Sequence, residues 1–210
     1  MKATNEIEIA GFRILPEALD TAAQAEIVAD CRAIIRAAPL VRPVTAWGKP
    51  MSVRMTSAGR AGWVIERGRY RYRSRHPETG APWPPIPASI LAVWRRVADW
   101  PADPDCCLLN WYGEAARMGL HQDKDEGRFE APVVSISLGD PARFRIGGTE
   151  RGGKTQSVVL RSGDVVVMGG AARLAYHGID RLITDQPPTA LVGRGRINLT
   201  LRVVDAAAIV

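Results

Sequence analysis

Six short apolar stretches follow one another between residues 106 and 204, and they constrain the fold more than any other feature of the sequence. In one of them, Val133 to Leu138, apolar residues alternate with serines, which predicts a strand with one buried and one polar face. Glycine-rich corners at Gly147-Gly148 and Gly152-Gly153 mark hairpins. The expected strands are residues 106–112, 133–138, 143–146, 157–160, 164–168 and 196–204. Successive short strands of this kind indicate a double-sheet β-roll.

Two helices are expected before these strands, with a short strand from Ile7 to Leu15 ahead of both. Thr21 and Gln24 can form a capping box at the start of the first helix, whose apolar residues recur at helical spacing until Pro39 stops it. The second helix spans Ala88 to Ala98, with an apolar stripe formed by Ile90, Trp94 and Val97. Helices that precede a run of strands pack on one side of the sheets, so we expect a mainly β, α+β fold.

The chain has 210 residues, which is most simply one domain, 1–210, with a single sizeable core. Its net charge of +6 and isoelectric point near 9.6 favour an anionic partner, nucleic acid before others. The three cysteines, Cys31, Cys106 and Cys107, are typical of packed thiols in a reducing compartment. With no charged-then-apolar leader and no apolar stretch of about 18 residues, we expect a cytoplasmic monomer without a membrane partner.

Arginine and tyrosine alternate between Glu66 and Arg75, in a region (residues 43–87) where glycine, proline, arginine and aromatic residues replace aliphatic ones. Read as one strand, the segment carries five arginines on one face and Tyr70 and Tyr72 on the other. Arginines that follow phosphates beside aromatic rings that stack on bases would serve a nucleic-acid lid. The alternative is a solvated edge strand whose charges prevent aggregation.

A histidine and a carboxylate two residues apart, His121 and Asp123, point to one side of an extended chain, and so does Asp125. His177 follows an expected strand that can return beside the first, which makes it the candidate third ligand. His76 is expected on the surface of the lid, without a metal. Two histidines and one carboxylate that leave positions open are the ligand set of non-haem Fe(II) oxygenases. The alternative is a surface His-x-Asp pair plus an ordinary histidine.

The last expected strand has an unusual polar face. Its apolar residues are Ile197, Leu199, Leu201 and Val203, and its polar residues are Arg196, Asn198, Thr200 and Arg202. Two arginines on the inner face of a roll are costly unless an anion satisfies them, and a dicarboxylate would do so through charge-assisted hydrogen bonds. Asn110 and Tyr112 share one face of their strand and could add donors. The alternative is an amphipathic edge strand with its polar face in solvent.

Four motifs follow one another along the chain: Asn110-x-Tyr112, His121-x-Asp123-x-Asp125-Glu126, His177-Gly178 and Arg196-x-Asn198-x-x-x-Arg202. Together they resemble the AlkB family of Fe(II)- and 2-oxoglutarate-dependent dioxygenases. The similarity runs from about Gly11 to Val204 and includes Met51-Ser52-Val53-x-Met55-Thr56 and Gly62-Trp63. This resemblance implies a double-stranded β-helix (jelly-roll) core at about 105–204, with flanking N-terminal helices and a nucleotide-recognition lid at about 43–87.

The resemblance also implies a role for individual residues. The implied Fe(II) ligands, which form the catalytic centre, are His121, Asp123 and His177. The implied 2-oxoglutarate pocket consists of Asn110, Tyr112, Arg196, Asn198 and Arg202. The implied contacts to the substrate nucleotide are Trp63, Tyr70, Asp125 and Arg151. Within the pocket, Arg196 would bind the distal carboxylate and Arg202 the carboxylate beside the keto group.

The activity that this resemblance implies is oxidative dealkylation of bases such as N1-methyladenine and N3-methylcytosine. It would use Fe(II), O2 and 2-oxoglutarate, release formaldehyde, succinate and CO2, and act on single- or double-stranded DNA, with RNA left open. A flipped-out base is required, because a stacked base cannot reach the metal. The alternatives are an oxygenase of protein or small-molecule substrates and a non-catalytic module that binds modified nucleic acid. Met168 and Ile197 depart from the family pattern and leave pocket shape and substrate preference open.

Overall fold

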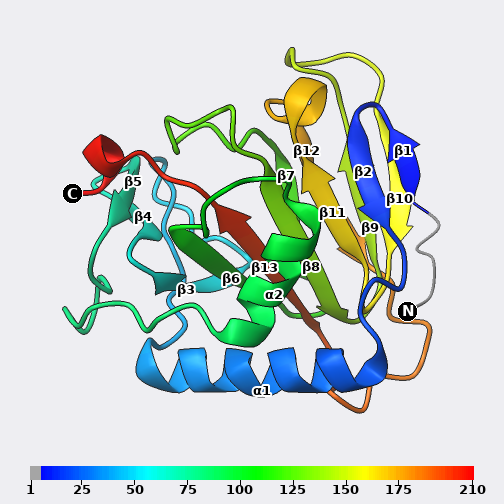
Figure 1. Ribbon diagram of the computed structural model, residues 1–210, viewed down its shortest axis with the longest axis horizontal. Helices are drawn as coiled ribbons and strands as arrows, with labels where there is room; N and C mark the ends of the chain where they lie inside the picture. Colours follow the sequence, from blue (N-terminus) through cyan, green and yellow to red (C-terminus); the bar gives the residue numbers. More distant parts are fainter. Residues whose placement is uncertain (1–5) are drawn as a thin grey trace.

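Two antiparallel sheets face each other in the computed structural model, which describes residues 6–210 (Figure 1). The seven-stranded sheet has the order β1 (Ile7–Ile9), β2 (Phe12–Leu15), β11 (Val165–Met168), β8 (Val133–Gly139), β13 (Arg196–Arg202), β6 (Cys106–Tyr112) and β3 (Arg54–Gly59). The four-stranded sheet has the order β10 (Gln156–Leu160), β9 (Ala142–Ile146), β12 (His177–Leu182) and β7 (Met118–His121). The double-sheet roll predicted from the sequence is confirmed.

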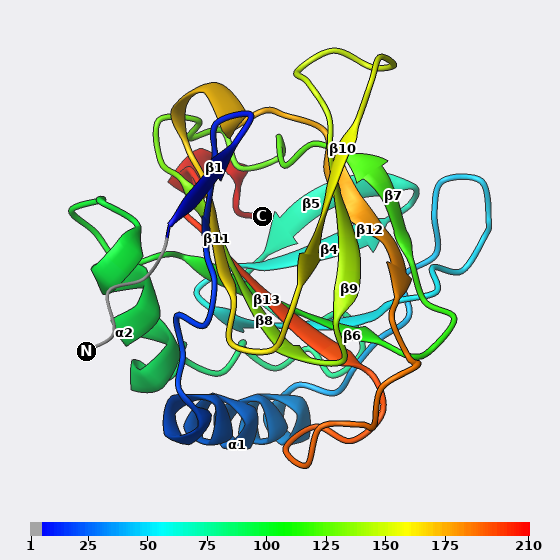
Figure 2. The same cartoon turned by 90° about the vertical axis from the view of Figure 1, so that its right-hand side faces the viewer.

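Two helices cover the outer face of the seven-stranded sheet, while the four-stranded sheet lies on its other side (Figure 2). These helices are α1 (Thr21–Ala37) and α2 (Ala88–Val97), both expected from the sequence. Their buried residues are Ile27, Val28, Cys31, Ile34, Ile90, Val93, Trp94 and Val97. Burying a large apolar side chain contributes about 2 kcal/mol, so these contacts fix both helices on the sheet.

The predicted capping box at the start of α1 is wrong. Asp20 is the N-cap, and its carboxylate accepts a hydrogen bond of 2.9 Å from the backbone N–H of Ala23. Thr21 is already the first helical residue. The Gln24 side chain instead donates to the carbonyl of Leu19 and accepts from the hydroxyl of Ser162, so it ties α1 to the loop before β11.

The strand β8 shows how the seven-stranded sheet separates two layers of the core. Its residues Val134, Ile136 and Leu138 face the helices. Ser135 and Ser137 point the other way, toward the space between the sheets, and their exposed fractions are only 8% and 0%. The expected alternation is present, but its polar face is buried as well, because polar side chains of β13 bond to both serines. A polar interior lies between the sheets.

A separate hairpin of β4 (Gly62–Glu66) and β5 (Arg69–Arg73) stands beside the two sheets. Its two-residue turn places Arg67 at φ 49° and Gly68 at φ 73°, as a tight hairpin turn requires. The segment 66–75 is therefore not one strand, as predicted, because it begins with this reversal. Only Arg69, Arg71 and Arg73 share a face of β5.

Other sequence predictions also need correction. The expected strand 7–15 is a hairpin of β1 and β2, because Ala10 and Gly11 both adopt positive φ (51° and 80°) and reverse the chain. The strands β3, β4, β7 and β12 were not anticipated as separate elements. Two short 3-10 turns, η1 (Gly170–Ala172) and η2 (Ala206–Ala208), complete the element order. Within residues 6–210, no helix is long and apolar enough to cross a membrane.

His76 is buried rather than on the surface of the lid, so that prediction is wrong. Its Nδ1 accepts from the backbone N–H groups of Glu78 and Thr79, which requires an unprotonated Nδ1. Its Nε2–H therefore donates to the carbonyl of Pro39 at 2.8 Å. Every polar atom of this ring is used by the backbone, and His76 is a structural residue.

Candidate active site

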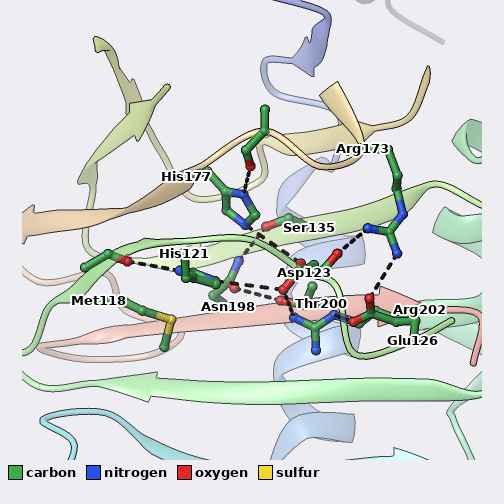
Figure 3. Close-up of polar contacts among 12 residues, drawn as sticks. Met118, His121, Asp123, Glu126, Ser135, Arg173, His177, Asn198, Thr200 and Arg202 are labelled. Atoms are coloured by element: carbon green, nitrogen blue, oxygen red, sulfur yellow. Dashed lines mark hydrogen bonds and ion pairs between the residues drawn. The ribbon is translucent and has the colours of Figure 1, made fainter. Parts of the chain in front are cut away.

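Three side chains converge at the open end of the space between the sheets. His121 ends β7, and His177 begins β12 directly opposite it in the sheet register. Asp123 lies in the loop two residues after β7. Potential ligand atoms of the three residues lie within 4.8 Å of one another (Figure 3). Asp123 Oδ1 is 3.9 Å from His121 Nε2, and Asp123 Oδ2 is 3.8 Å from His177 Nε2.

Backbone carbonyls orient both histidines. His121 Nδ1 lies 3.0 Å from the carbonyl oxygen of Gly119, and His177 Nδ1 lies 3.0 Å from that of Ala175. A carbonyl oxygen can only accept, so each Nδ1 carries a proton and each Nε2 is the ring nitrogen turned toward Asp123. Burial and the neighbouring His121 lower the pKa of His177 to about 4, which keeps this ring neutral near pH 7.

Asp123 is buried and ionised. Burial alone would raise the pKa of its carboxyl, but the positive charge of Arg202 outweighs burial and holds that pKa well below its usual range. Arg202 Nη2 donates to Asp123 Oδ1 at 2.8 Å. The other oxygen, Oδ2, is buried without a hydrogen-bond partner among residues 6–210. A carboxylate oxygen left free beside two imidazole lone pairs fits a divalent cation.

The polar face of β13 lies against the same space. Arg196 is fully buried, and its guanidinium donates to Ser137 Oγ at 2.6 Å and to the carbonyls of Asp140 and Leu160. Burial lowers the pKa of Arg196 to about 10, so the side chain is still charged at neutral pH. Among the described residues, Arg196 Nε and Arg202 Nη1 have no hydrogen-bond partner. Two buried guanidiniums with free donors fit an anion that carries two carboxylates.

Two asparagines and a tyrosine face the arginines. Asn198 lies opposite Asn110 in the sheet register, and Arg196 lies opposite Tyr112. The amide of Asn198 donates to Ser135 Oγ at 2.7 Å, while Asn110 Oδ1 is buried without a partner in the described part of the chain. These side chains are fixed by their strands, so they form a pre-organised polar wall.

A buried network behind Asp123 was missed by the sequence reasoning. Glu126 is 1% exposed and binds three side chains. The Tyr72 hydroxyl donates to its Oε1 at 2.8 Å, Arg173 Nη2 donates to its Oε2 at 3.1 Å, and Arg202 Nε lies 3.3 Å from Oε1. Arg173 also donates to the carbonyl of Asp123 at 2.6 Å. Glu126 belonged to a recognised motif without an assigned role, whereas nothing in the sequence around Arg173 indicated a contact with the site.

The hairpin closes the outer side of the site with two aromatic rings. Trp63 and Tyr70 stack with ring centroids 5.2 Å apart and an interplanar angle of 25°. The indole N–H of Trp63 donates to Asp125 Oδ2 at 3.2 Å, which links the hairpin to the loop that carries Asp123. Arg151 reaches the same site from the loop between β9 and β10.

One cavity of about 600 Å³ connects the candidate metal ligands, the polar wall and the two aromatic rings. It is lined by all twelve predicted site residues: Trp63, Tyr70, Asn110, Tyr112, His121, Asp123, Asp125, Arg151, His177, Arg196, Asn198 and Arg202. Met168 also lines it, so this departure from the family pattern does shape the pocket. Ile197 instead packs into the core on the helical side of the sheet, so it does not.

The chain matches known proteins over most of its length. Residues 11–202 match the family described as the 2OG-Fe(II) oxygenase superfamily. Over 194 residues it is 50% identical to the "Alpha-ketoglutarate-dependent dioxygenase AlkB homolog" of Caulobacter vibrioides (strain NA1000 / CB15N), a match that covers 92% of this chain and 88% of that protein. Over 181 residues it is 41% identical to the "Alpha-ketoglutarate-dependent dioxygenase AlkB" of Escherichia coli (strain K12), with 84% and 83% covered. The structure of OsALKBH1 is similar, with a TM-score of 0.78 and 31% identity, over 93% of this chain and 99% of that chain.

Proposed function

Because the chain belongs to the AlkB family of Fe(II)- and 2-oxoglutarate-dependent dioxygenases, we propose that it dealkylates N-alkylated nucleobases by oxidation. One observation carries this proposal. The candidate metal ligands, two buried arginines with free donors and a pair of stacked aromatic rings all line a single cavity. Such a cavity can bring a metal, a dicarboxylate and a flat base together.

His121, Asp123 and His177 would hold Fe(II), since they offer two imidazole nitrogens and one carboxylate oxygen within 4.8 Å of one another. Bound together, Fe(II), O2 and 2-oxoglutarate supply the oxidation of a C–H bond. The protein's own contribution is to hold the three metal ligands in place. The carbonyls of Gly119 and Ala175 fix the two rings, and Arg202 and Arg173 fix the side chain and backbone of Asp123.

Arg202 and Arg196 would orient 2-oxoglutarate. Arg202 already bonds to Asp123, so a carboxylate that it binds lies next to the metal ligands and is the one beside the keto group. Arg196 would bind the distal carboxylate, where Tyr112 lies opposite it in the register. Asn110 and Asn198 complete the pocket with amide groups on the same polar wall. Bidentate guanidinium contacts fix direction as well as affinity.

The overall reaction balances in two steps. An N-methyl group, 2-oxoglutarate and O2 give an N-hydroxymethyl group, succinate and CO2, so that one oxygen atom enters the base and the other enters succinate. The C–N bond of the hydroxymethyl group then breaks, so that its electron pair returns to the ring nitrogen as a lone pair, formaldehyde leaves, and the hydroxyl proton goes to solvent. The target base must leave the stack to enter the cavity, where Trp63 and Tyr70 would contact the nucleotide.

Asp125 and Arg151 would face the damaged base. N1-methyladenine and N3-methylcytosine carry a positive charge, whereas undamaged bases are neutral. A carboxylate about 4 Å from such a cation contributes up to about 4 kcal/mol at an effective dielectric constant near 20. The half-buried Asp125 would therefore favour cationic lesions, and the Trp63 N–H that binds its Oδ2 holds it in place.

We extend the proposal to the setting of the reaction. The natural substrate would be alkylated single- or double-stranded DNA, with RNA as a second candidate, and the protein would act as a cytoplasmic monomer formed by one domain. Cys31, Cys106 and Cys107 are all free thiols, which suits a reducing compartment. Residues 43–87 would be the nucleotide-recognition lid, since they include the hairpin that carries Trp63 and Tyr70, and residues 105–204 the catalytic core.

The test is loss of the methyl group from a single-stranded oligonucleotide that bears one N1-methyladenine, followed by mass spectrometry. The reaction contains Fe(II), ascorbate and 2-oxoglutarate, and His121→Ala serves as the inactive variant. We expect demethylation by the wild type and none by the variant. Succinate without demethylation would mean an oxygenase with a protein or small-molecule substrate. No succinate despite bound metal would mean a module that only binds modified nucleic acid.

A further inference from the structure

The β4–β5 hairpin has two chemically different faces. The cross-strand register places Trp63, Ile65, Tyr70 and Tyr72 on one face, which is the side of the cavity. The opposite face carries Arg69, Arg71 and Arg73 from β5, across from Glu66, Val64 and Gly62 of β4. The aromatic face is accounted for by the proposed nucleotide contacts. The arginine face takes no part in them.

The arginine face encloses a hollow of its own. It is lined by Glu66, Arg67, Arg69, Arg71 and Arg73. Four guanidiniums thus face one carboxylate, and that carboxylate pairs with Arg73. In the described part of the chain, the side chains of Arg67, Arg69 and Arg71 donate no hydrogen bond and form no ion pair, so their donors are free. A hollow with this excess of positive charge fits an anion.

Protection of a strand edge explains these arginines less well than anion binding does. Neighbouring guanidiniums on one face repel each other and destabilise the strand. On an open edge this cost is offset because the charges prevent pairing with strands of other molecules. Part of the edge of β5, from Tyr72 to Ser74, is however already covered by the end of this same chain. The N–H of Val210 donates to the carbonyl of Tyr72 at 2.9 Å, and the N–H of Ser74 donates to the carbonyl of Val210. At these positions no arginine is needed to block the edge.

The hollow lies across the hairpin from the cavity, and exposed aromatic rings mark the mouth of that cavity. Tyr70, 48% exposed, and Trp47, 81% exposed, both line the cavity and reach solvent. Gly68 at the hairpin tip lies against Ala46, so that an added Cβ would come within 3.2 Å of Ala46. Exposed aromatic rings beside free guanidiniums are the components of a single-strand path, since rings stack on bases and arginines bind phosphates.

We propose that the outer face of the β4–β5 hairpin is a phosphate site, which holds phosphodiesters further along the strand than the two nucleotides that flank the one in the cavity. This inference rests on the proposed function only in that the phosphates belong to the nucleic-acid strand whose target base enters the cavity. Arg67, Arg69 and Arg71 supply the contacts, and Glu66 keeps Arg73 in place. The hairpin then grips nucleic acid on both faces, with the target base inside and the continuing backbone outside. We expect a trinucleotide, which ends at the two nucleotides next to the target, to leave the hollow unfilled.

The test is the salt dependence of binding to the double variant Arg69→Ala/Arg71→Ala. Fluorescence anisotropy measures the affinity of the full chain for an unmodified single strand of about twelve nucleotides, a length within the usual range of such sites. Removal of one phosphate contact lowers the slope of log K against log salt by about 0.7, so removal of two lowers it by about 1.4. We expect this decrease, together with about tenfold weaker binding at moderate salt.

A matched control removes the same charge elsewhere. Arg36→Ala/Arg161→Ala changes two exposed arginines, one on α1 and one after β10. We expect this pair to leave the slope nearly unchanged, and we expect both double variants to bind a trinucleotide like the wild type. Equal slopes for the two double variants would overturn the proposal, since they would mean that only net charge matters. If the hairpin variant unfolds early in a melt, Arg69→Glu alone, at an exposed position, replaces it.

The same experiment separates this inference from the proposed function. Binding to an unmodified strand needs no turnover, so a reduced slope supports the phosphate site whether or not methyl groups are removed. Demethylation of a trinucleotide by the wild type together with an unchanged slope would leave the proposed function intact and refute the phosphate site.

Discussion

Two strands of this protein carry arginines along one face, and they use them in opposite ways. On β13, Arg196 and Arg202 are 0% and 5% exposed, and hydrogen bonds fix parts of each guanidinium. On β5, Arg69 is exposed and Arg71 is half-buried, and neither has a hydrogen-bonded side chain in the described structure. Burial pre-organises the first pair for an anion. Desolvation of the two guanidiniums costs free energy, and a carboxylate bound to them would return it. Exposure leaves the second pair free to change conformation, and it makes their interactions with an anion weak and sensitive to salt.

The largest effect is expected where the buried strand meets the metal ligands. Asp123→Asn keeps the shape of the side chain but removes the charge that pairs with Arg202 and would bind the metal. We expect turnover to fall at least about a thousandfold and Fe(II) affinity to fall with it. Asp180→Asn, an exposed carboxylate on β12, is the matched control and should leave both unchanged. Normal metal affinity in Asp123→Asn, measured by calorimetry with a divalent ion, would contradict the ligand assignment.

The next effect concerns the buried arginines themselves. Arg196→Lys keeps a positive charge but loses the planar fork, so one carboxylate of 2-oxoglutarate loses its paired hydrogen bonds. A charge-assisted bond contributes about 1.5–3 kcal/mol, which predicts about tenfold to a hundredfold weaker binding of 2-oxoglutarate. Anaerobic titration measures this, with exposed Arg143→Lys on β9 as the control. If 2-oxoglutarate bound equally well to both variants, Arg196 would not belong to the pocket.

Asp125 lies between the two regions, in the loop after β7 and in contact with the hairpin through Trp63. Asp125→Ala should lower kcat/KM for the cationic N1-methyladenine about tenfold, while kcat/KM for a neutral base such as N6-methyladenine changes less. The comparison of the two substrates checks this selectivity. An equal loss of metal binding in the variant would show that Asp125 supports the metal site instead.

Tyr72 connects the exposed hairpin to the buried network, since its hydroxyl donates to Glu126 beside Arg202. Tyr72→Phe removes this bond alone and should cost about 1 kcal/mol, or roughly 2–4 °C in Tm for a chain of this size. We expect Tyr70→Phe, whose ring is partly exposed, to leave Tm unchanged. A melting curve for Tyr72→Phe that matches the wild type would mean that the hairpin and the buried site are not coupled.

The smallest effect is expected on the exposed strand. Arg69→Ala alone removes one screened interaction worth at most about 1 kcal/mol, which predicts up to about fivefold weaker binding of a long single strand at low salt. At high salt the variant and the wild type should converge. A loss that persists at high salt would place Arg69 in a buried contact, and the two strands would then not differ in how they use their arginines.

The sequence predicted the buried strand better than the exposed one, and the reason is physical. Alternation along Arg196–Val203 leaves few possible placements of this strand, because the apolar residues on one face must enter a core and the polar face must then meet an anion. The roles of the twelve site residues were implied by the family resemblance, and the structure places all twelve around one cavity. The hairpin reversal at Arg67-Gly68 depends on two positive φ angles, and alternation continues across it without any sign in the pattern.

Contacts between residues far apart in the sequence could not be predicted from the sequence either. Arg173, Glu126 and Tyr72 come from three separate segments and meet only when the fold is complete. His76 was misplaced for the same reason, because the backbone groups that bury it belong to a loop and to Pro39. Asp20 replaced Thr21 as the N-cap because both residue types can cap a helix, and only the local backbone decides between them.

We propose that one cavity couples oxidation of 2-oxoglutarate to demethylation of a base. The most direct test is the ratio of succinate to formaldehyde released with a saturating trinucleotide that carries N1-methyladenine. We predict one succinate for each formaldehyde in the wild type and neither product in Asp123→Asn. Succinate that accumulates without formaldehyde at saturating trinucleotide would contradict the claim, because the oxidation would then not be directed at the base.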